Sequence, residues 1–302
     1  MDWLSRLLDL VPVRGRLEFR CLYGAPWVVA YEDSPRGEYP YHAILSGAAV
    51  LGSGASARPL RAGDILVATR GGAHRLHDGG GEEADPARQV QKLNLVLSEN
   101  DGGGERLDML CGRFVVAPPF DRWMTLYLPP VLVVRAGQEL TSLVGLMRGE
   151  TAAETLGGYA MLNALSTAMF ALVLRRAAES GDAPQGLLAL AGDPRLAPAL
   201  AAMFSRPEHP WTLPELADRC GMSRATLIRR FQDALGRSAG DLLTDIRMTL
   251  AARKLEDPSL STGAVGEDVG YQSEAAFQRA FKLHMGVTPA VWRKERRSQK
   301  VV

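Results

Sequence analysis

The chain has 302 residues, of which 46% are apolar and 23% are charged, a composition typical of soluble globular proteins with two or three domains. Its net charge of +1 hides an asymmetry, because residues 205–302 hold 16 Lys and Arg against 12 Asp and Glu, whereas the remainder holds 19 against 22. Three cysteines exclude a secreted disulfide framework. We expect neither a signal peptide nor a membrane span, and therefore a cytoplasmic protein.

The first ten residues predict a short helix, since their apolar residues recur at helical spacing. From about Leu17 to Val134, short apolar runs separated by Gly, Pro and Asp predict β-strands. From Glu139 to about Phe204 the pattern becomes helical.

A long helix predicted over 158–179 carries an apolar stripe with a row of alanines beside it. The stripe comprises Leu162, Leu165, Met169 and Leu172, and the alanines are Ala160, Ala164, Ala168 and Ala171. Small residues allow helices to approach closely, so this helix is a candidate homodimer interface. The alternative is that the stripe packs on the protein's own β-barrel.

The last hundred residues contain one kind of unit twice, over 211–239 and 261–289. Each unit predicts a short helix, a turn opened by glycine and a second helix closed by glycine, so that the two helix-turn-helix spans are 213–236 and 262–286. A helix over 241–257, with Leu242, Ile246 and Leu250 on its buried face, would connect them. Two tandem units in a basic region predict binding to double-stranded DNA.

Phe231 and Leu227 in the first unit, and Phe277 and Phe281 in the second, are expected to face the core, with Ser223 and Ser273 as N-caps. The remaining positions are candidate DNA contacts. For base edges we predict Ala225, Ile228, Arg229, Glu274, Ala275, Gln278 and Arg279, with Arg229 and Arg279 as the leading candidates. For phosphates we predict Arg224, Arg230, Gln272 and Ser273.

The segments GMSRATLIRRF, IRMTLAARKLEDPSLS and VGYQSEAAFQRAFKLHMGVTP resemble the signature of the AraC/XylS family of bacterial transcription regulators over essentially all of 205–295. The resemblance implies a sequence-specific operator, a transcriptional activator and contact with RNA polymerase. Gly266 stands where the family usually has alanine, which implies a weaker second unit, and Ala239 stands where proline is usual.

GDILVATRGGAHRLHD resembles the second cupin motif, and YHAILSG resembles a reduced first motif. Strand alternation could aim His42 into the barrel, close to His74. A cupin metal site normally has three histidines and a glutamate, whereas only these two, with His77 as a candidate third, are present here. The sequence leaves two readings open: a metal site, or two histidines that are hydrogen-bonded or line a small ligand pocket.

Residues 1–135 as a whole resemble the cupin sensor of one branch of this family, through MDWLSRLLDL, RCLYGAPW, YHAILSGAAVL, GDILVATRGGAHRL, LCGRF and LPPVLVV. That branch includes a regulator that senses reactive chlorine species, and its cysteine positions carry over to Cys21 and Cys111. Arg20 and Arg113 are close in sequence and could lower the thiol pKa values. The alternative is that both cysteines are structural. Cys220 is expected in the core.

These patterns together predict an α+β protein with a cupin-like β-barrel over 1–136, a helical linker over 137–204 and a DNA-binding domain over 205–302. The predicted function is a DNA-binding regulator that responds to thiol oxidation or to a small ligand. A cupin enzyme fused to a DNA-binding tail is disfavoured, because the metal set is incomplete and no catalytic arrangement stands out. We predict no cofactor apart from the metal left open above.

Overall fold

The computed structural model describes residues 1–54, 57–80, 84, 86–153, 155–180 and 185–300. Its strands are β1 (Val13–Gly24), β2 (Val28–Tyr31), β3 (Glu38–Ser46), β4 (Ala48–Leu51), β5 (Arg58–Arg61), β6 (Asp64–Ala68), β7 (His74–His77), β8 (Arg88–Gln91), β9 (Val96–Glu99), β10 (Arg106–Val116) and β11 (Val131–Arg135). Its helices are α1 (Trp3–Leu10), α2 (Arg122–Tyr127), α3 (Gln138–Ala153), α4 (Gly158–Ser180), α5 (Leu187–Gly192), α6 (Ala197–Ser205), α7 (Leu213–Arg219), α8 (Arg224–Leu235), α9 (Ala239–Lys254), α10 (Thr262–Asp268), α11 (Glu274–Met285) and α12 (Pro289–Lys300).

The chain divides into two compact units, one comprising Val13–Ala183 and the other comprising Met1–Pro12 with Pro184–Val302. This division differs from the three domains predicted from the sequence. The predicted linker is shared, because α3 and α4 belong to the β-rich unit and α5 and α6 to the helical unit. Helix α1 also joins the helical unit, where Trp3 packs on Phe204 with ring centroids 6.3 Å apart.

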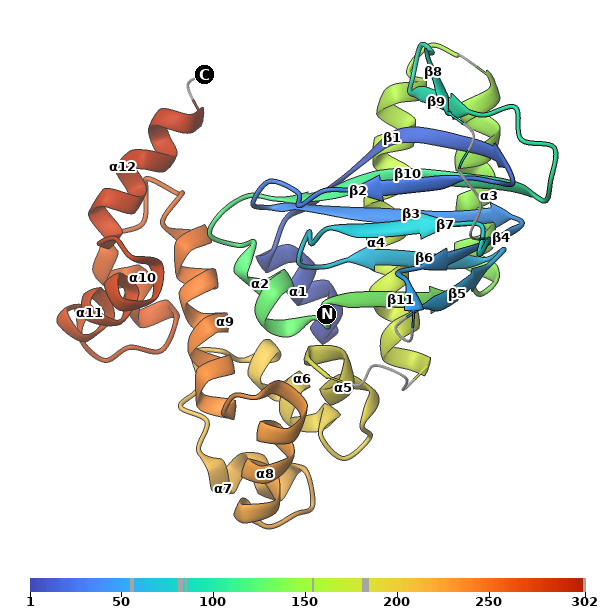
Figure 1. Ribbon diagram of the computed structural model, residues 1–302. Helices are drawn as coiled ribbons and strands as arrows, with labels where there is room; N and C mark the ends of the chain where they lie inside the picture. Colours follow the sequence, from blue (N-terminus) through green and yellow to red (C-terminus); the bar gives the residue numbers. More distant parts are fainter. Residues whose placement is uncertain (55–56, 81–83, 85, 154, 181–184, 301–302) are drawn as a thin grey trace. The chain divides into compact units, whose positions relative to one another are not determined.

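Two antiparallel-dominated sheets form the β-rich unit. One has the strand order β11-β6-β3-β10-β1-β9-β8, and the other has the order β2-β7-β4-β5 (Figure 1). Side chains from both sheets share one core cluster, which includes Trp27, Ile44, Leu60, Leu76 and Met109. The core therefore lies between the sheets, as a cupin barrel requires.

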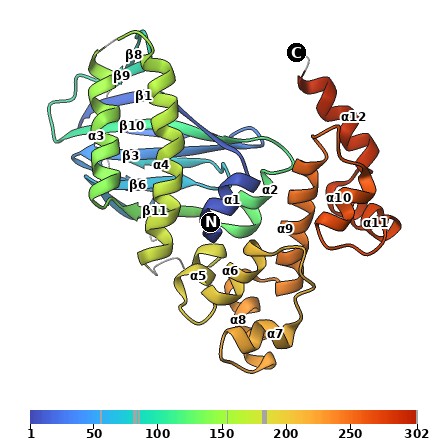
Figure 2. The same cartoon turned by 180° about the vertical axis from the view of Figure 1, so that it is seen from behind.

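Helices α3 and α4 cover the other face of the larger sheet (Figure 2). Tyr41 points to this side, where its hydroxyl is 2.8 Å from Ser166 Oγ of α4, and Phe114 packs on Phe170. Successive strand residues alternate between the two faces, so His42 points the opposite way, into the barrel. The prediction for His42 is confirmed.

The buried face of α4 includes Leu162, Met169, Phe170 and Val173, and α4 packs mainly on β1. Leu162 and Met169 of the predicted interface stripe are therefore covered by the protein's own sheet. Leu165 and Leu172 are half-buried, whereas Ala160, Ala164 and Ala168 are exposed.

The sequence prediction found no segment of transmembrane length, but among the described helices α4 is long and apolar enough to cross a membrane, by length and composition. A helix that packs one face on a sheet passes the same test.

The helical unit holds the two predicted helix-turn-helix pairs, α7–α8 and α10–α11, with α9 between them (Figure 1). Helix α9 begins at Ala239 rather than at Asp241, and it is buried on more than the predicted face. Leu242 and Ile246 are buried as expected, and Leu243, Met248, Ala251 and Ala252 are buried as well, whereas Leu250 is half-buried.

Gly15 of β1 permits the close approach of strand and helix. A Cβ at this position would lie 2.4 Å from backbone atoms of Ser166 and Thr167 in α4, and the Gly15 N–H donates to Thr167 Oγ1 at 2.8 Å. Since backbone cannot move aside as a flexible side chain can, Gly15→Ala should lower the free energy of unfolding by about 2–3 kcal/mol.

Chemical denaturation checks this value. Gly103→Ala is the matched control, because an added Cβ there meets nothing within 4 Å. A Gly15→Ala protein as stable as the control would show that α4 does not pack as described.

Candidate functional site

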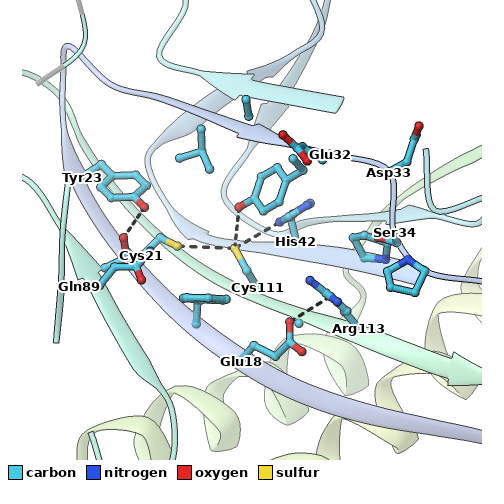
Figure 3. A pocket seen from close by; sticks show the side chains of 18 residues that line it. Glu18, Cys21, Tyr23, Glu32, Asp33, Ser34, His42, Gln89, Cys111 and Arg113 are labelled. Carbon is cyan, nitrogen blue, oxygen red and sulfur yellow. Dashed lines mark hydrogen bonds and ion pairs between the residues drawn. The ribbon is translucent and has the colours of Figure 1, made fainter. Parts of the chain in front are cut away.

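A cavity of about 340 Å³ opens inside the barrel, and its walls come from strands of both sheets (Figure 3). Phe19, Tyr31, Cys21, His42 and Cys111 line it. Both thiols are buried, with 3% and 2% exposure, yet each contributes to the cavity wall. The cavity therefore brings together the two cysteines and the first histidine that the sequence singled out.

The two cysteines lie on neighbouring antiparallel strands. In the register of β1 with β10, Phe19 pairs with Cys111 and Cys21 pairs with Met109, so the cysteines are diagonal neighbours on the inner face. Their Sγ atoms are 3.7 Å apart. A disulfide needs about 2.05 Å, so a shift of less than 2 Å would join them.

A chain of hydrogen bonds runs from Cys111 through both histidines. Cys111 Sγ lies 3.2 Å from His42 Nδ1, His42 Nε2 lies 2.8 Å from His74 Nε2, and His74 Nδ1 lies 2.9 Å from Gly72 O. A carbonyl oxygen only accepts, so His74 Nδ1 carries the hydrogen. When both rings are neutral, His42 must then donate from Nε2, and its Nδ1 is free to accept the Cys111 thiol proton.

The two imidazoles are neutral because burial disfavours their charged forms. Desolvation lowers the pKa of His42 well below its usual range, with a smaller contribution from neighbouring His74, and desolvation also lowers the pKa of His74. His42 Nδ1 therefore presents a lone pair to the Cys111 thiol.

The two thiols differ in acidity. The hydrogen bond from Cys111 lowers the pKa of Cys21, while burial raises the pKa of Cys111 well above its usual range. The single thiol proton of Cys111 can point either to His42 Nδ1 or to Cys21 Sγ, and in the second orientation it stabilises a Cys21 thiolate, which makes Cys21 the more nucleophilic sulfur.

The cations expected from the sequence do not supply this effect. The Arg20 guanidinium forms an ion pair with Asp108 at 2.9 Å, and Arg113 pairs with Glu18 at 3.2 Å and with Glu38 at 2.6 Å. Carboxylates therefore take up both charges, and hydrogen bonding rather than a free cation lowers the Cys21 pKa.

Sequence reasoning missed Tyr31, the last residue of β2. Its ring stacks on His74 with centroids 4.8 Å apart, and its hydroxyl lies 3.5 Å from Cys111 Sγ. Burial raises the pKa of Tyr31 well above its usual range, so its hydroxyl stays protonated. No local sequence pattern indicates this tyrosine, because its position beside Cys111 depends on how the two sheets pack against each other.

The two histidines do not fit a cupin metal centre. Among the described residues, no group of three or more His, Cys, Asp and Glu is placed to share an ion. The nitrogens of His42 and His74 that would face a metal are hydrogen-bonded to each other. His77, the candidate third ligand, bonds instead to Gly52 O at 2.9 Å.

The first helix-turn-helix forms as the sequence predicts. Ser223 caps α8 by accepting from Thr226 N, and Gly236 ends the helix in the left-handed conformation with φ of 66°. Leu227 and Phe231 are buried. Arg224, Ala225, Ile228 and Arg229 are exposed, so this face of α8 is free to meet DNA.

Arg230, whose contact with a phosphate stays a prediction, has an ion-pair partner within the protein. It is half-buried, and its Nη1 lies 2.7 Å from Asp193 Oδ2, at the end of α5. This ion pair ties α8 to the helical segment before it, so Arg230 serves the packing of the unit.

The second helix-turn-helix repeats the arrangement. Ser273 caps α11, and Phe277 and Phe281 are buried. The predicted contacts are exposed, namely Gln272, Ser273, Glu274, Ala275, Gln278 and Arg279. Gln278 donates to Glu274 across one turn at 2.9 Å, so these two side chains form one polar patch.

The packing of Phe277 explains why glycine stands at position 266, which the family resemblance alone did not indicate. A Cβ at Gly266 in α10 would lie 3.0 Å from Cγ of Phe277, tighter than ordinary van der Waals contact. The glycine lets this phenylalanine pack closely on α10, at the cost in backbone entropy that glycine brings to a helix.

Known protein families match both the β-rich region and the helix-turn-helix region of the chain. A family described as Cupin matches residues 2–179, and a family described as Helix-turn-helix domain matches residues 216–295. An uncharacterized HTH-type transcriptional regulator of Haemophilus influenzae is 31% identical to the chain and covers 97% of it, with 99% of that protein matched. The HTH-type transcriptional regulator MtrA of Neisseria gonorrhoeae is 30% identical, with 98% of this chain and 99% of that protein covered.

The RCS-specific HTH-type transcriptional activator RclR of Escherichia coli is 28% identical, with 97% of each chain covered. These relatives are regulators that match almost from end to end, so the likeness includes the cupin domain as well as the DNA-binding region. The chain belongs to the AraC-type DNA-binding transcription regulators that carry an N-terminal cupin domain.

Proposed function

We propose that the regulator senses oxidants through Cys21 and Cys111, and that formation of a disulfide between them changes its binding to DNA. The observation that carries the proposal is the 3.7 Å separation of two Sγ atoms at the wall of a cavity, with an imidazole in hydrogen-bond reach. The similarity to an RCS-specific activator supports an oxidant of the hypochlorous acid type.

The chemistry takes two steps. In the first, the Cys21 thiolate attacks the chlorine of hypochlorous acid, so that an S–Cl bond forms, the Cl–O bond breaks and hydroxide leaves to become water. In the second, Cys111 sulfur attacks Cys21 sulfur, an S–S bond forms and chloride leaves. His42 Nδ1 accepts the proton that Cys111 releases. Two thiols are oxidised, and the oxidant is reduced to chloride and water.

A small ligand in the same cavity is the second candidate signal. The cavity is large enough for a small organic molecule, and Phe19, Val29, Tyr31 and Pro40 supply apolar surface beside His42. Such a ligand would act without a disulfide, which separates the two candidates.

We further propose that the protein forms a homodimer and activates transcription. Leu146 on α3 and Tyr159 and Met161 on α4 expose more than half of their surface, and the exposed alanines of α4 lie on the same helix, so we assign a homodimer interface to these helices. In the proposed role, the protein acts in the cytoplasm and activates transcription through contact with RNA polymerase. It does not act as an enzyme.

The disulfide provides the first test. Near-stoichiometric hypochlorous acid should produce a Cys21–Cys111 disulfide in the purified protein, detected by peptide mass spectrometry without reduction, because the sulfur atoms are already adjacent. Cys220→Ser is the matched control and should leave the disulfide unchanged. If both thiols stay reduced until the oxidant is in large excess, thiol sensing is wrong and a cavity ligand becomes the leading signal.

Thiol acidity provides a second test. The pKa of Cys21 is lowered by its hydrogen bond from Cys111, so a pulse of iodoacetamide should label Cys21 before Cys111 as the pH rises. Cys111→Ala removes the donor, so the midpoint of Cys21 labelling should move to higher pH. Labelling of Cys111 first would contradict the assigned nucleophile.

DNA recognition provides a third test. If Arg229 or Arg279 reads a base with two hydrogen bonds, its replacement by alanine should cost about 1–3 kcal/mol and relax the preference at that base. Selection from a random DNA pool followed by titration measures both. Arg224→Ala is the comparison, because loss of a phosphate contact weakens all sequences alike and lowers the salt slope by about 1. An unchanged preference at every base in both arginine variants would overturn their assignment.

A further inference from the structure

A buried carboxylate lies in the middle of the DNA-binding region. Asp245 of α9 is 1% exposed, although the helix carrying it links the two helix-turn-helix pairs. Its Oδ2 forms an ion pair with Arg237 Nη2 at 3.2 Å, and its Oδ1 lies 2.9 Å from His284 Nε2. Each oxygen of one carboxylate therefore faces a different partner.

One partner lies in the turn after the first recognition helix, and the other lies at the end of the second. Arg237 stands between Gly236, the C-cap of α8, and Ser238, the N-cap of α9. His284 lies in the last turn of α11. One carboxylate on the connecting helix thus contacts both the turn that follows α8 and the carboxyl end of α11.

Stability alone does not account for this arrangement. Taking a carboxylate out of water is costly, and replacing a buried ion pair with apolar residues of similar volume is often neutral or stabilising. A buried carboxylate differs from an apolar contact, because its charge is tolerated only while its partners stay close to its oxygen atoms, and this restricts where those partners can lie. Asp245 is therefore suited to set an angle between helices.

We propose that Asp245 is a positioning residue for DNA recognition: it holds α8 and α11 in one mutual orientation so that both can read one operator. The proposal builds on DNA binding by both helix-turn-helix pairs. Two linked binding elements gain affinity from the effective concentration of the second, by about 10²–10⁴, only if geometry lets both engage together. Loss of the Asp245 contacts should remove part of this gain and leave each element's own contacts intact.

The experiment uses the full chain and DNA that the wild-type protein selects from a random pool. Affinity is measured for the intact selected site, for versions with either half scrambled, and for versions with one or two base pairs inserted between the halves. Asp245→Ala should weaken binding to the intact site by at least about tenfold, while affinity for each half-scrambled site changes less than about threefold. It should also reduce the penalty of the insertions.

Two further variants separate positioning from folding. Asp245→Asn is nearly isosteric and keeps a hydrogen-bond acceptor, so it should be intermediate on the intact site with a melting temperature close to that of the wild type. His284→Gln, which removes one arm of the contact, should show the same selective loss. Asp268→Asn is the matched control, because Asp268 pairs with Lys254 at 2.7 Å on the surface, and it should change none of these affinities.

Two results would overturn the proposal. Equal losses on the intact and the half-scrambled sites in Asp245→Asn would show a general effect on the fold. Unchanged affinity and unchanged insertion penalties in both Asp245 variants would show that the connecting helix holds its orientation without the carboxylate.

Discussion

The pairing of β1 with β10 is the constraint on which the geometry of the cavity and its two thiols depends. Its register places Cys21 and Cys111 on the same face of neighbouring strands, and the face is the one that the second sheet covers. A slip of one residue in this ladder would turn one thiol to the opposite face of the sheet. The geometry that allows a disulfide is thus a property of strand register, fixed by the burial of the surrounding side chains.

Burial also decides how the thiols can react. Both thiols are buried, and the hydrogen-bonded chain from Cys111 through His42 to His74 offers an acceptor for the Cys111 proton. Because desolvation keeps both imidazoles neutral, the chain starts in the state that accepts a proton. The cavity is lined by thiols, imidazole and aromatic rings, whereas charged contacts join segments of the DNA-binding unit. There, Asp245 contacts Arg237 and His284, and Arg230 pairs with Asp193.

Local sequence patterns predicted the helix-turn-helix pairs well, because their determinants are close together in the chain. Caps such as Ser223 and Ser273, and buried pairs such as Leu227 and Phe231, follow from helical spacing and hydrogen-bonding capacity alone. Alternation along β3 likewise predicted that His42 points inward.

Features that depend on distant segments could not be predicted in this way. The adjacency of Cys21 and Cys111 was suggested by family resemblance, since nothing within either segment encodes the strand register. The place of Tyr31 beside Cys111, the pairing of Arg230 with Asp193 and the contact of Asp245 with His284 each join residues more than 35 positions apart. The packing of α1 with the helical unit, which begins some 170 residues later, likewise has no local signal in the sequence.

In the proposed function, the redox state of Cys21 and Cys111 controls DNA binding. The most direct measurement is the affinity of the full-length protein for its selected operator in the reduced state, after near-stoichiometric hypochlorous acid, and after subsequent reduction. We expect a reversible change of roughly tenfold, within the usual range of allosteric coupling, that is lost in Cys21→Ser. Equal affinities in the reduced state and in a state with the Cys21–Cys111 disulfide demonstrated would contradict it.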